Sequence, residues 1–359
     1  MKVYIESMGC DSSISDANQL RECCLNNSLE ITGNYMEADY IVLFSCGFNS
    51  IILSENINRF KKFYKNQKAK LILTGCVPKI KPSFFRIADF YFGSREMHKF
   101  NTLFNFKKKI EEFSPNFNRK DKKIIRISTG CCGKCSYCAI KIATGYVKSR
   151  KAEEIIKDIK QGLKEGINKF VFTSEDNGSW GQDFSKNICN LLEKITHIGG
   201  DFKILLTTFN PRWFIKYPEL YSLFKSSKFE KNIYLSLQSG SNRMLKLMNR
   251  GYSVKEYLDV YNRLKKEIPE IKIRSDFLVG FPSENNEDFN ETLKFIQKLD
   301  FYFIQVFSYT DMEGTTAKNI GPKINKVIKE KRVKKIIKLF LEKNKNEKRE
   351  LINTNIIFN

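Results

Sequence analysis

The chain has 359 residues, 42% of them apolar, which allows two or three domains with sizeable cores and excludes global disorder. Its 62 Lys and Arg outnumber 40 Asp and Glu, and the net charge of +22 favours a polyanionic partner, nucleic acid first. No secretory signal or long apolar run is visible, so we expect a cytoplasmic protein with no membrane anchor. Thiols stay reduced in that compartment, which makes the ten cysteines candidates for metal ligands or catalytic groups.

The first part of the chain, residues 1–100, alternates short β-rich runs with stretches that are mostly long enough for helices. Alternation of this kind predicts a parallel α/β sheet. Apolar runs such as YIVLF and LILT are typical of strands buried on both faces of such a sheet. The predicted strands are residues 2–7, 39–45, 70–74 and 88–92.

Three cysteines occupy the same place in this repeated unit. Cys10, Cys46 and Cys76 each come just after one of the first three predicted strands. Because ligands bind at the carboxyl ends of parallel strands, we expect these thiols to converge on one edge of the sheet, with ordinary buried thiols as the alternative. Ordinary buried thiols are preferred for the cysteines within helical runs, which are Cys23, Cys24 and Cys189.

The rest of the chain divides into three segments. Residues 101–121 are polar and basic and predict a linker. Residues 122–320 repeat the strand–helix alternation six times, which predicts an open, partial (β/α)6 barrel, because a closed eight-unit barrel needs about 250 residues. The tail, residues 321–359, predicts a basic helix with one packed face and one face that is either solvated or in contact with RNA. The predicted barrel strands are residues 124–128, 169–173, 203–207, 232–237, 272–279 and 301–307, and the helices between them include residues 152–165, 243–248, 254–267 and 287–299.

The strongest chemical signal is TGCCGKCSYC at residues 129–138, just after the first predicted barrel strand. The cysteines of this stretch fit two possible ligand spacings, Cys131-x3-Cys135-x2-Cys138 and Cys132-x2-Cys135-x2-Cys138. Thiolates favour iron–sulfur clusters or zinc. A structural zinc or a ferredoxin-type carrier would need a fourth ligand, and neither histidine lies nearby in sequence. Three ligands leave one metal open to a substrate, which favours a catalytic iron–sulfur cluster over zinc or a pure electron carrier.

The spacing CxxxCxxC after the first strand of a β/α barrel resembles the radical S-adenosylmethionine superfamily. The three upstream cysteines resemble the N-terminal domain of its methylthiotransferases. TSEDNGSWGQD at 173–183 resembles the TSEDTGAYGRD stretch of the archaeal and eukaryotic members, which act on threonylcarbamoyladenosine in tRNA. Three further stretches, LQSGSNRMLKLMNRGY, DFLVGFPSENNEDF and FSYTDMEGTTA, resemble family motifs in the same order, so that the likeness covers about residues 1–320.

The resemblance implies two [4Fe–4S] clusters and S-adenosylmethionine as cofactors. Cys131, Cys135 and Cys138 would bind the radical-generating cluster. An auxiliary cluster that holds the sulfur for transfer would be bound by Cys10, Cys46 and Cys76. The residues implied to bind S-adenosylmethionine at the strand ends are Ser174, Glu175, Gln238, Ser239, Arg250 and Gly280, with Asp176, Ser241 and Pro282 beside them.

The implied activity is the addition of a methylthio group to C2 of N6-threonylcarbamoyladenosine at position 37 of tRNA. Alternatives are the same chemistry on isopentenyladenosine or on a ribosomal protein, and a non-catalytic iron–sulfur protein that binds RNA. The implied partners are tRNA, a flavodoxin- or ferredoxin-like electron donor and a sulfur donor, and a monomer is expected. Candidates for stacking on RNA bases are Tyr146, Trp180, Phe209 and Trp213, with packing within loops as the alternative for each.

The chain departs from the family pattern in three places. Thr144 stands where the family usually has Arg, and SYTDMEGTT lacks the usual Pro-Arg-Pro context. No run of five short strands follows residue 330, so the small C-terminal RNA-binding barrel of the family, the TRAM barrel, is not expected. Binding of tRNA would then fall to the basic tail and surface or to a separate chain.

Overall fold

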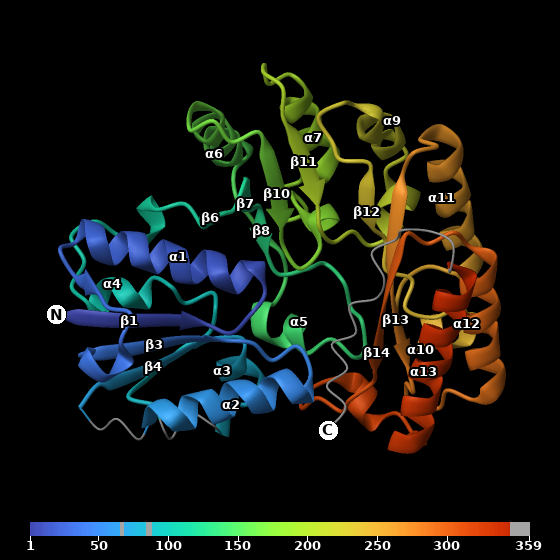
Figure 1. Cartoon of the computed structure of the whole chain (residues 1–359), viewed down its shortest axis with the longest axis horizontal. Helices are drawn as coiled ribbons and strands as arrows, with labels where there is room; N and C mark the ends of the chain where they lie inside the picture. The colour runs from blue at the N-terminus through green and yellow to red at the C-terminus, as the bar shows by residue number, and fades with distance from the viewer. Residues whose placement is uncertain (65–67, 84–87, 345–359) are drawn as a thin grey trace.

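The computed structural model describes residues 1–64, 68–83 and 88–344, and the end of the predicted tail, residues 345–359, lies outside them. Two β-sheet units stand side by side, the N-terminal sheet at the left of Figure 1 and the barrel at the right. The short helix α5 (Ala139–Thr144) lies between them and packs on α3 (Val77–Ile80) of the first unit. None of the helices described has the length and apolar character needed to cross a bilayer.

The N-terminal unit is a five-stranded parallel sheet with the strand order β2-β1-β3-β4-β5. Along β3 the side chains alternate between two cores, because successive residues of a strand point to opposite faces. Val42 and Phe44 pack under α1, and Ile41 and Leu43 pack under α2. The predicted parallel sheet is therefore confirmed. Its elements are β1 (Lys2–Ser7), α1 (Asp11–Asn26), β2 (Glu30–Ile31), β3 (Tyr40–Ser45), α2 (Ser50–Tyr64), β4 (Lys70–Gly75) and β5 (Phe90–Tyr91).

Residues 101–121, for which the polar composition predicted a linker, are folded. They begin within α4 (Lys99–Leu103) and include η3 (Ile110–Glu112). They also include β6 (Asn116–Arg119), which pairs antiparallel with the first barrel strand. Phe104, Phe106 and Ile110 are buried in the same core as α1. The linker prediction missed this because three apolar side chains inside a basic run are enough to dock it onto an existing core.

The second unit is the open barrel that was predicted. Six parallel strands follow one another around it, and single bridges join its two halves, from Ile204 to Phe229 and from Phe209 to Leu235. At one end β6 occupies the outer edge of β7, and at the other α13 packs on β14. The strands are β7 (Lys122–Arg126), β10 (Lys169–Thr173), β11 (Lys203–Leu206), β12 (Asn232–Tyr234), β13 (Lys272–Val279) and β14 (Phe303–Ser308).

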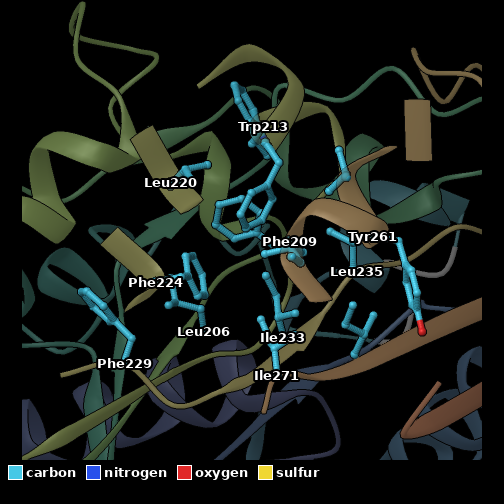
Figure 2. Packing of buried hydrophobic residues seen from close by; sticks show 14 of the residues in the cluster. Leu206, Phe209, Trp213, Leu220, Phe224, Phe229, Ile233, Leu235, Tyr261 and Ile271 are labelled. Atoms are coloured by element: carbon cyan, nitrogen blue, oxygen red, sulfur yellow. The ribbon is translucent and has the colours of Figure 1, made fainter. Parts of the chain in front are cut away.

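A single large core fills the barrel, and Figure 2 shows Leu206, Phe209 and Ile233 within it. The helices cover the outside of the strands, as apolar stripes at helical spacing require. In the described part of the chain, α13 is the last element, and no five-stranded barrel follows β14. The helices are α6 (Ala152–Lys164), α7 (Ile188–Thr196), α8 (Arg212–Lys216), α9 (Glu219–Lys225), α10 (Asn242–Leu247), α11 (Val254–Glu267), α12 (Asn286–Lys298) and α13 (Lys326–Lys343).

Candidate functional site

The three cysteines that follow strands of the N-terminal sheet come together at its carboxyl edge. Cys46 and Cys76 directly follow the neighbouring strands β3 and β4, and the Cys76 N–H donates to the carbonyl of Ser45 at 2.8 Å. Cys10 is the N-cap residue of α1. The strand order places β1, β3 and β4 next to one another, so residues far apart in sequence share one edge.

The thiols of this group affect one another's protonation. Burial raises the pKa of Cys46 to about 11, and the neighbouring Cys10 adds to that rise. Burial also raises the pKa of Cys76, together with the charges of Cys46 and Cys10. Cys10 itself is exposed, yet burial by the surrounding protein is the main cause of its raised pKa. The three thiols therefore lie close enough for their charges to act on one another.

The second group of cysteines lies in the loop that leaves the barrel after β8 (Ser128–Thr129) and returns through α5 to β9 (Lys148–Ser149). The Gly133 N–H donates to the Cys131 sulfur at 3.1 Å. Arg250, which is buried, donates from Nη1 to the Cys135 sulfur at 3.3 Å. Burial and the neighbouring Cys135 raise the pKa of Cys138 to about 11. The loop therefore holds three partly buried thiols with N–H donors aimed at two of them.

Cys131 is also tied to the second barrel strand through Asp176. The carboxylate of Asp176 accepts from Trp213 Nε1 at 2.7 Å, from Ser179 Oγ at 2.8 Å and from Arg212 at 3.3 Å. The Cys131 thiol lies 3.7 Å from the same carboxylate. Burial, followed by this negative charge, raises the pKa of Cys131 to about 12. The Asp176 carboxylate thus binds other protein groups beside the cysteine loop and helps to hold that loop in place.

The thiols of the cysteine motif have different neighbours. The sulfurs of Cys131 and Cys135 both lie beside Gly133. The side chain of Cys132 packs against the barrel core instead. This difference favours the spacing Cys131-x3-Cys135-x2-Cys138 as the ligand set, which stays a prediction.

Glu175 stands between the two groups of thiols. It follows β10, and its carboxylate accepts from the Gly130 N–H at 2.7 Å, one residue before Cys131. Its charge contributes to the raised pKa values of Cys10 and Cys76 in the other unit. Burial raises the pKa of Glu175 itself. The side chain implied to bind the cofactor amine thus lies where the two sheets meet.

The remaining residues implied to bind S-adenosylmethionine already have protein partners. Ser174 Oγ donates to Asn177 Oδ1 at 2.6 Å, and Ser239 Oγ lies 3.1 Å from Thr292 Oγ1. Gln238 lies beyond the end of β12, has a φ of 78° in the left-handed region, and donates its N–H to the carbonyl of Asp276 at 2.8 Å. At Gly280 a Cβ would meet the side chain of Lys329 from α13, so that the close approach at this glycine is made by the chain itself.

Three of the four residues predicted to stack on RNA bases are buried, so the prediction is wrong for those three. Trp180, Phe209 and Trp213 are at most 3% exposed, and Figure 2 shows Phe209 and Trp213 within the barrel core. Tyr146 remains exposed, at 53%. Arg95, which no sequence pattern indicated, reaches from the first unit to the carbonyls of Thr129 and Tyr146. Charged residues are frequent in this chain, and nothing around Arg95 distinguishes it.

Among the described residues, no three His, Cys, Asp or Glu side chains are arranged around a single metal ion. Each cysteine that binds a [4Fe–4S] cluster binds a different iron, so the ligands surround a larger space than one ion fills. Two sets of three neighbouring thiols fit two such clusters, because soft thiolate donors favour iron–sulfur binding and each set leaves one iron open.

Comparison with known proteins gives matches to both units. Residues 125–296 match the radical SAM superfamily, and residues 2–90 match the uncharacterized protein family UPF0004. A probable threonylcarbamoyladenosine tRNA methylthiotransferase of Pyrococcus horikoshii is 30% identical over 88% of this chain and 79% of that protein. A tRNA-2-methylthio-N(6)-dimethylallyladenosine synthase of Caldicellulosiruptor saccharolyticus is 30% identical over 94% of this chain and 78% of that protein.

Solved structures share the fold. The radical S-adenosylmethionine methyltransferase TsrM of Kitasatospora setae, with cobalamin and a [4Fe–4S] cluster bound, aligns with a TM-score of 0.66. The alignment covers 88% of this chain and 77% of the TsrM chain. Because the sequence identity is 11%, the likeness concerns the fold alone.

Proposed function

The chain belongs to the radical S-adenosylmethionine methylthiotransferase family, and on that premise we propose that it adds a methylthio group to C2 of N6-threonylcarbamoyladenosine at position 37 of tRNA. Archaeal relatives at 30% identity carry the name of this activity, and the TSEDNGSWGQD stretch resembles theirs. The observation that carries the proposal is that Glu175, which accepts from Gly130 in the cysteine loop of the barrel, also acts through its charge on Cys10 and Cys76 of the N-terminal sheet.

Proteins of this family bind two [4Fe–4S] clusters and S-adenosylmethionine. When bound, these groups supply a radical strong enough to remove hydrogen from an unactivated ring carbon. We assign the radical-generating site to Cys131, Cys135 and Cys138. We assign the site that holds the sulfur to Cys10, Cys46 and Cys76.

The protein residues around these sites orient the ligands and exclude water. Arg250 would hold Cys135 as a thiolate through its charged N–H, which is the stronger kind of hydrogen bond. Ser179, which accepts from the Cys132 N–H and donates to Asp176, would hold the loop beside Cys131. Glu175 would hold the amine of S-adenosylmethionine at the junction of the two sheets. The other assigned cofactor contacts are Ser174, Gln238, Ser239 and Gly280.

A basic surface suits a polyanionic substrate, and the proposal includes tRNA, a flavodoxin- or ferredoxin-like electron donor and a sulfur donor as partners. We place the reaction in the cytoplasm, where these partners meet, and we expect the chain to act as a monomer.

The test is an anaerobic assay of the reconstituted protein with reductant, S-adenosylmethionine and threonylcarbamoylated tRNA, followed by nucleoside mass spectrometry. The methylthiolated nucleoside should appear. Replacing Cys131, Cys135 or Cys138 with Ala should abolish formation of 5′-deoxyadenosine. Replacing Cys10, Cys46 or Cys76 with Ala should leave 5′-deoxyadenosine and abolish the methylthio product. Equal loss of 5′-deoxyadenosine in both sets would contradict the two assignments.

A second candidate substrate is the dimethylallyl (isopentenyl) adenosine of tRNA. Relatives named for it are as similar to this chain, with 30% identity over 94% of its length. The same assay separates the two when it is run in parallel with tRNA carrying either nucleoside. Product from the dimethylallyl substrate alone would replace our proposal with this one.

A further inference from the structure

An exposed aromatic ring stands beside the cysteine loop. Tyr146 is 53% exposed and lies between α5 and β9, two residues after the end of α5. The backbone here is joined to the loop, because the Cys131 N–H donates to the carbonyl of Gly145 at 3.3 Å. The ring is therefore close to the first ligand of the proposed radical site and open to solvent.

Two contacts hold Tyr146 in place. The Arg95 guanidinium donates to the Tyr146 carbonyl, and the Lys141 ammonium lies 5.3 Å from the ring centroid. A large apolar ring that stays in water contributes no free energy of burial to folding. A fixed exposed ring is, however, well suited to accept a flat partner, because little conformational freedom is lost on binding.

The charges around the ring are mostly positive. Arg95 and Lys141 touch Tyr146, and Arg212, beside Gly133 of the cysteine loop, also acts on the tyrosine hydroxyl. Asp183 is the carboxylate that acts on it most directly. Aromatic faces among cations are typical of single-stranded nucleic acid sites, in which the cations meet phosphates and the rings stack on bases.

Other exposed aromatic rings in the described part of the chain differ from this one. Phe48 packs edge-on against Phe307, and Phe184 packs edge-on against Trp180, with centroid distances of 5.3 Å in both pairs. Tyr64 is 56% exposed at the end of α2, in the other unit. Tyr146 combines exposure, a fixed ring, a cationic surrounding and closeness to the cysteine loop.

We propose that Tyr146 is a stacking platform for a nucleobase adjacent to the modified nucleoside, with Lys141 and Arg212 contacting the phosphates around it. This rests on the proposed function, because it takes the substrate to be tRNA. Splayed bases stacked on aromatic side chains are the usual way in which proteins recognise single-stranded RNA loops.

The experiment measures binding of a fluorescein-labelled anticodon stem–loop carrying threonylcarbamoyladenosine to the reconstituted full chain, by anisotropy. Tyr146→Ala should raise Kd about tenfold, since a base stacked on an aromatic ring contributes about 1–3 kcal/mol. Tyr146→Phe keeps the ring and should bind within about twofold of the wild type. The matched control Tyr64→Ala removes an equally exposed ring elsewhere and should do the same.

A second stem–loop carries 2-aminopurine next to the target nucleoside. Its fluorescence should be quenched by the wild type and by Tyr146→Phe, but not by Tyr146→Ala. Binding of Tyr146→Ala within twofold of the wild type would overturn the inference. An equal loss in Tyr146→Phe would also overturn it, because that loss would assign the effect to the hydroxyl and not to the ring. If the wild type binds the stem–loop and leaves its nucleoside unmodified, the proposed function fails and the Tyr146 result still stands. If the wild type does not bind RNA, both fail.

Discussion

Glu175 links the two sheet units, because it touches the cysteine loop of one unit and its charge acts on thiols of the other. It is hydrogen-bonded to Gly130 in the cysteine loop, and its carboxylate contributes to the raised pKa values of Cys10 and Cys76. The sequence placed Glu175 at the end of a barrel strand, as the structure does. That it also faces the first sheet follows from how the two units dock, which no local pattern encodes.

Glu175→Gln should make Cys10 more reactive in the cluster-free protein. The variant keeps an acceptor for Gly130 and removes the negative charge that disfavours the thiolate. Because the thiolate is the nucleophile, alkylation of Cys10 by iodoacetamide at pH 8 should become severalfold faster. Mass spectrometry of the Cys10 peptide follows the rate. Glu55→Gln, an exposed carboxylate on α2, is the control and should have no effect; an unchanged rate in Glu175→Gln would show that its charge does not reach Cys10.

At the scale of elements, α13 packs one face on the barrel, and some of its basic residues take part in that packing. Val333, Ile336 and Phe340 are buried, as the helical spacing predicted. Part of its positive charge also serves the fold: Arg332 is buried and pairs with the buried Glu284, and Lys329 donates to the carbonyl of Tyr309 at 2.7 Å. Contact of its outer face with RNA stays a prediction. A charge count could not separate these roles, because it does not show which lysine or arginine turns inward.

Phe106→Ala tests whether residues 101–121 are part of the first unit. Phe106 is 1% exposed, so its truncation should lower the free energy of unfolding by about 3–5 kcal/mol, as for a buried ring. Lys107→Ala, an exposed neighbour, should change it by less than about 0.5 kcal/mol. Urea denaturation of the cluster-free protein measures both. Similar stability of the two variants would mean that the segment is a linker after all.

At the scale of the whole molecule, protonated thiols are part of the stability of the cluster-free protein. Burial raises the pKa of Cys24, Cys131 and Cys189 to about 12 and that of Cys23 and Cys46 to about 11. In the unfolded chain these thiols titrate near their ordinary pKa of about 8.5. The unfolded state therefore loses protons first as the pH rises, which favours unfolding.

The free energy of unfolding should consequently be insensitive to these thiols below about pH 8 and should fall as the pH rises through 9 to about 11. Each thiol that stays protonated only in the folded state contributes a slope of up to about 1.4 kcal/mol per pH unit. Urea denaturation with reductant and chelator present gives the profile. Cys189→Ala should be less stable at neutral pH and have a shallower slope by about this amount. An identical slope would show that Cys189 is not held as a thiol.

Local pattern was sufficient for much of this protein. Strand runs and helical spacing predicted both sheets, since apolar periodicity depends only on which face of an element is buried. Cys10, Cys46 and Cys76 each follow a strand of the repeated unit, which predicted that they meet. The reason is that parallel strands bring their carboxyl ends to one edge of the sheet. The spacing of Cys131, Cys135 and Cys138 indicated the second group, since a loop this short holds its thiols close together.

Tertiary structure decided the rest. It turned Cys132 toward the barrel core, buried Trp180, Phe209 and Trp213, and left Tyr146 exposed. It also brought Arg95 of one unit onto the cysteine loop of the other. These outcomes depend on the docking of surfaces far apart in the chain. An aromatic residue or an arginine has the same local sequence pattern whether it is buried or exposed. Only the packed structure therefore distinguishes a buried ring from one that is available to RNA.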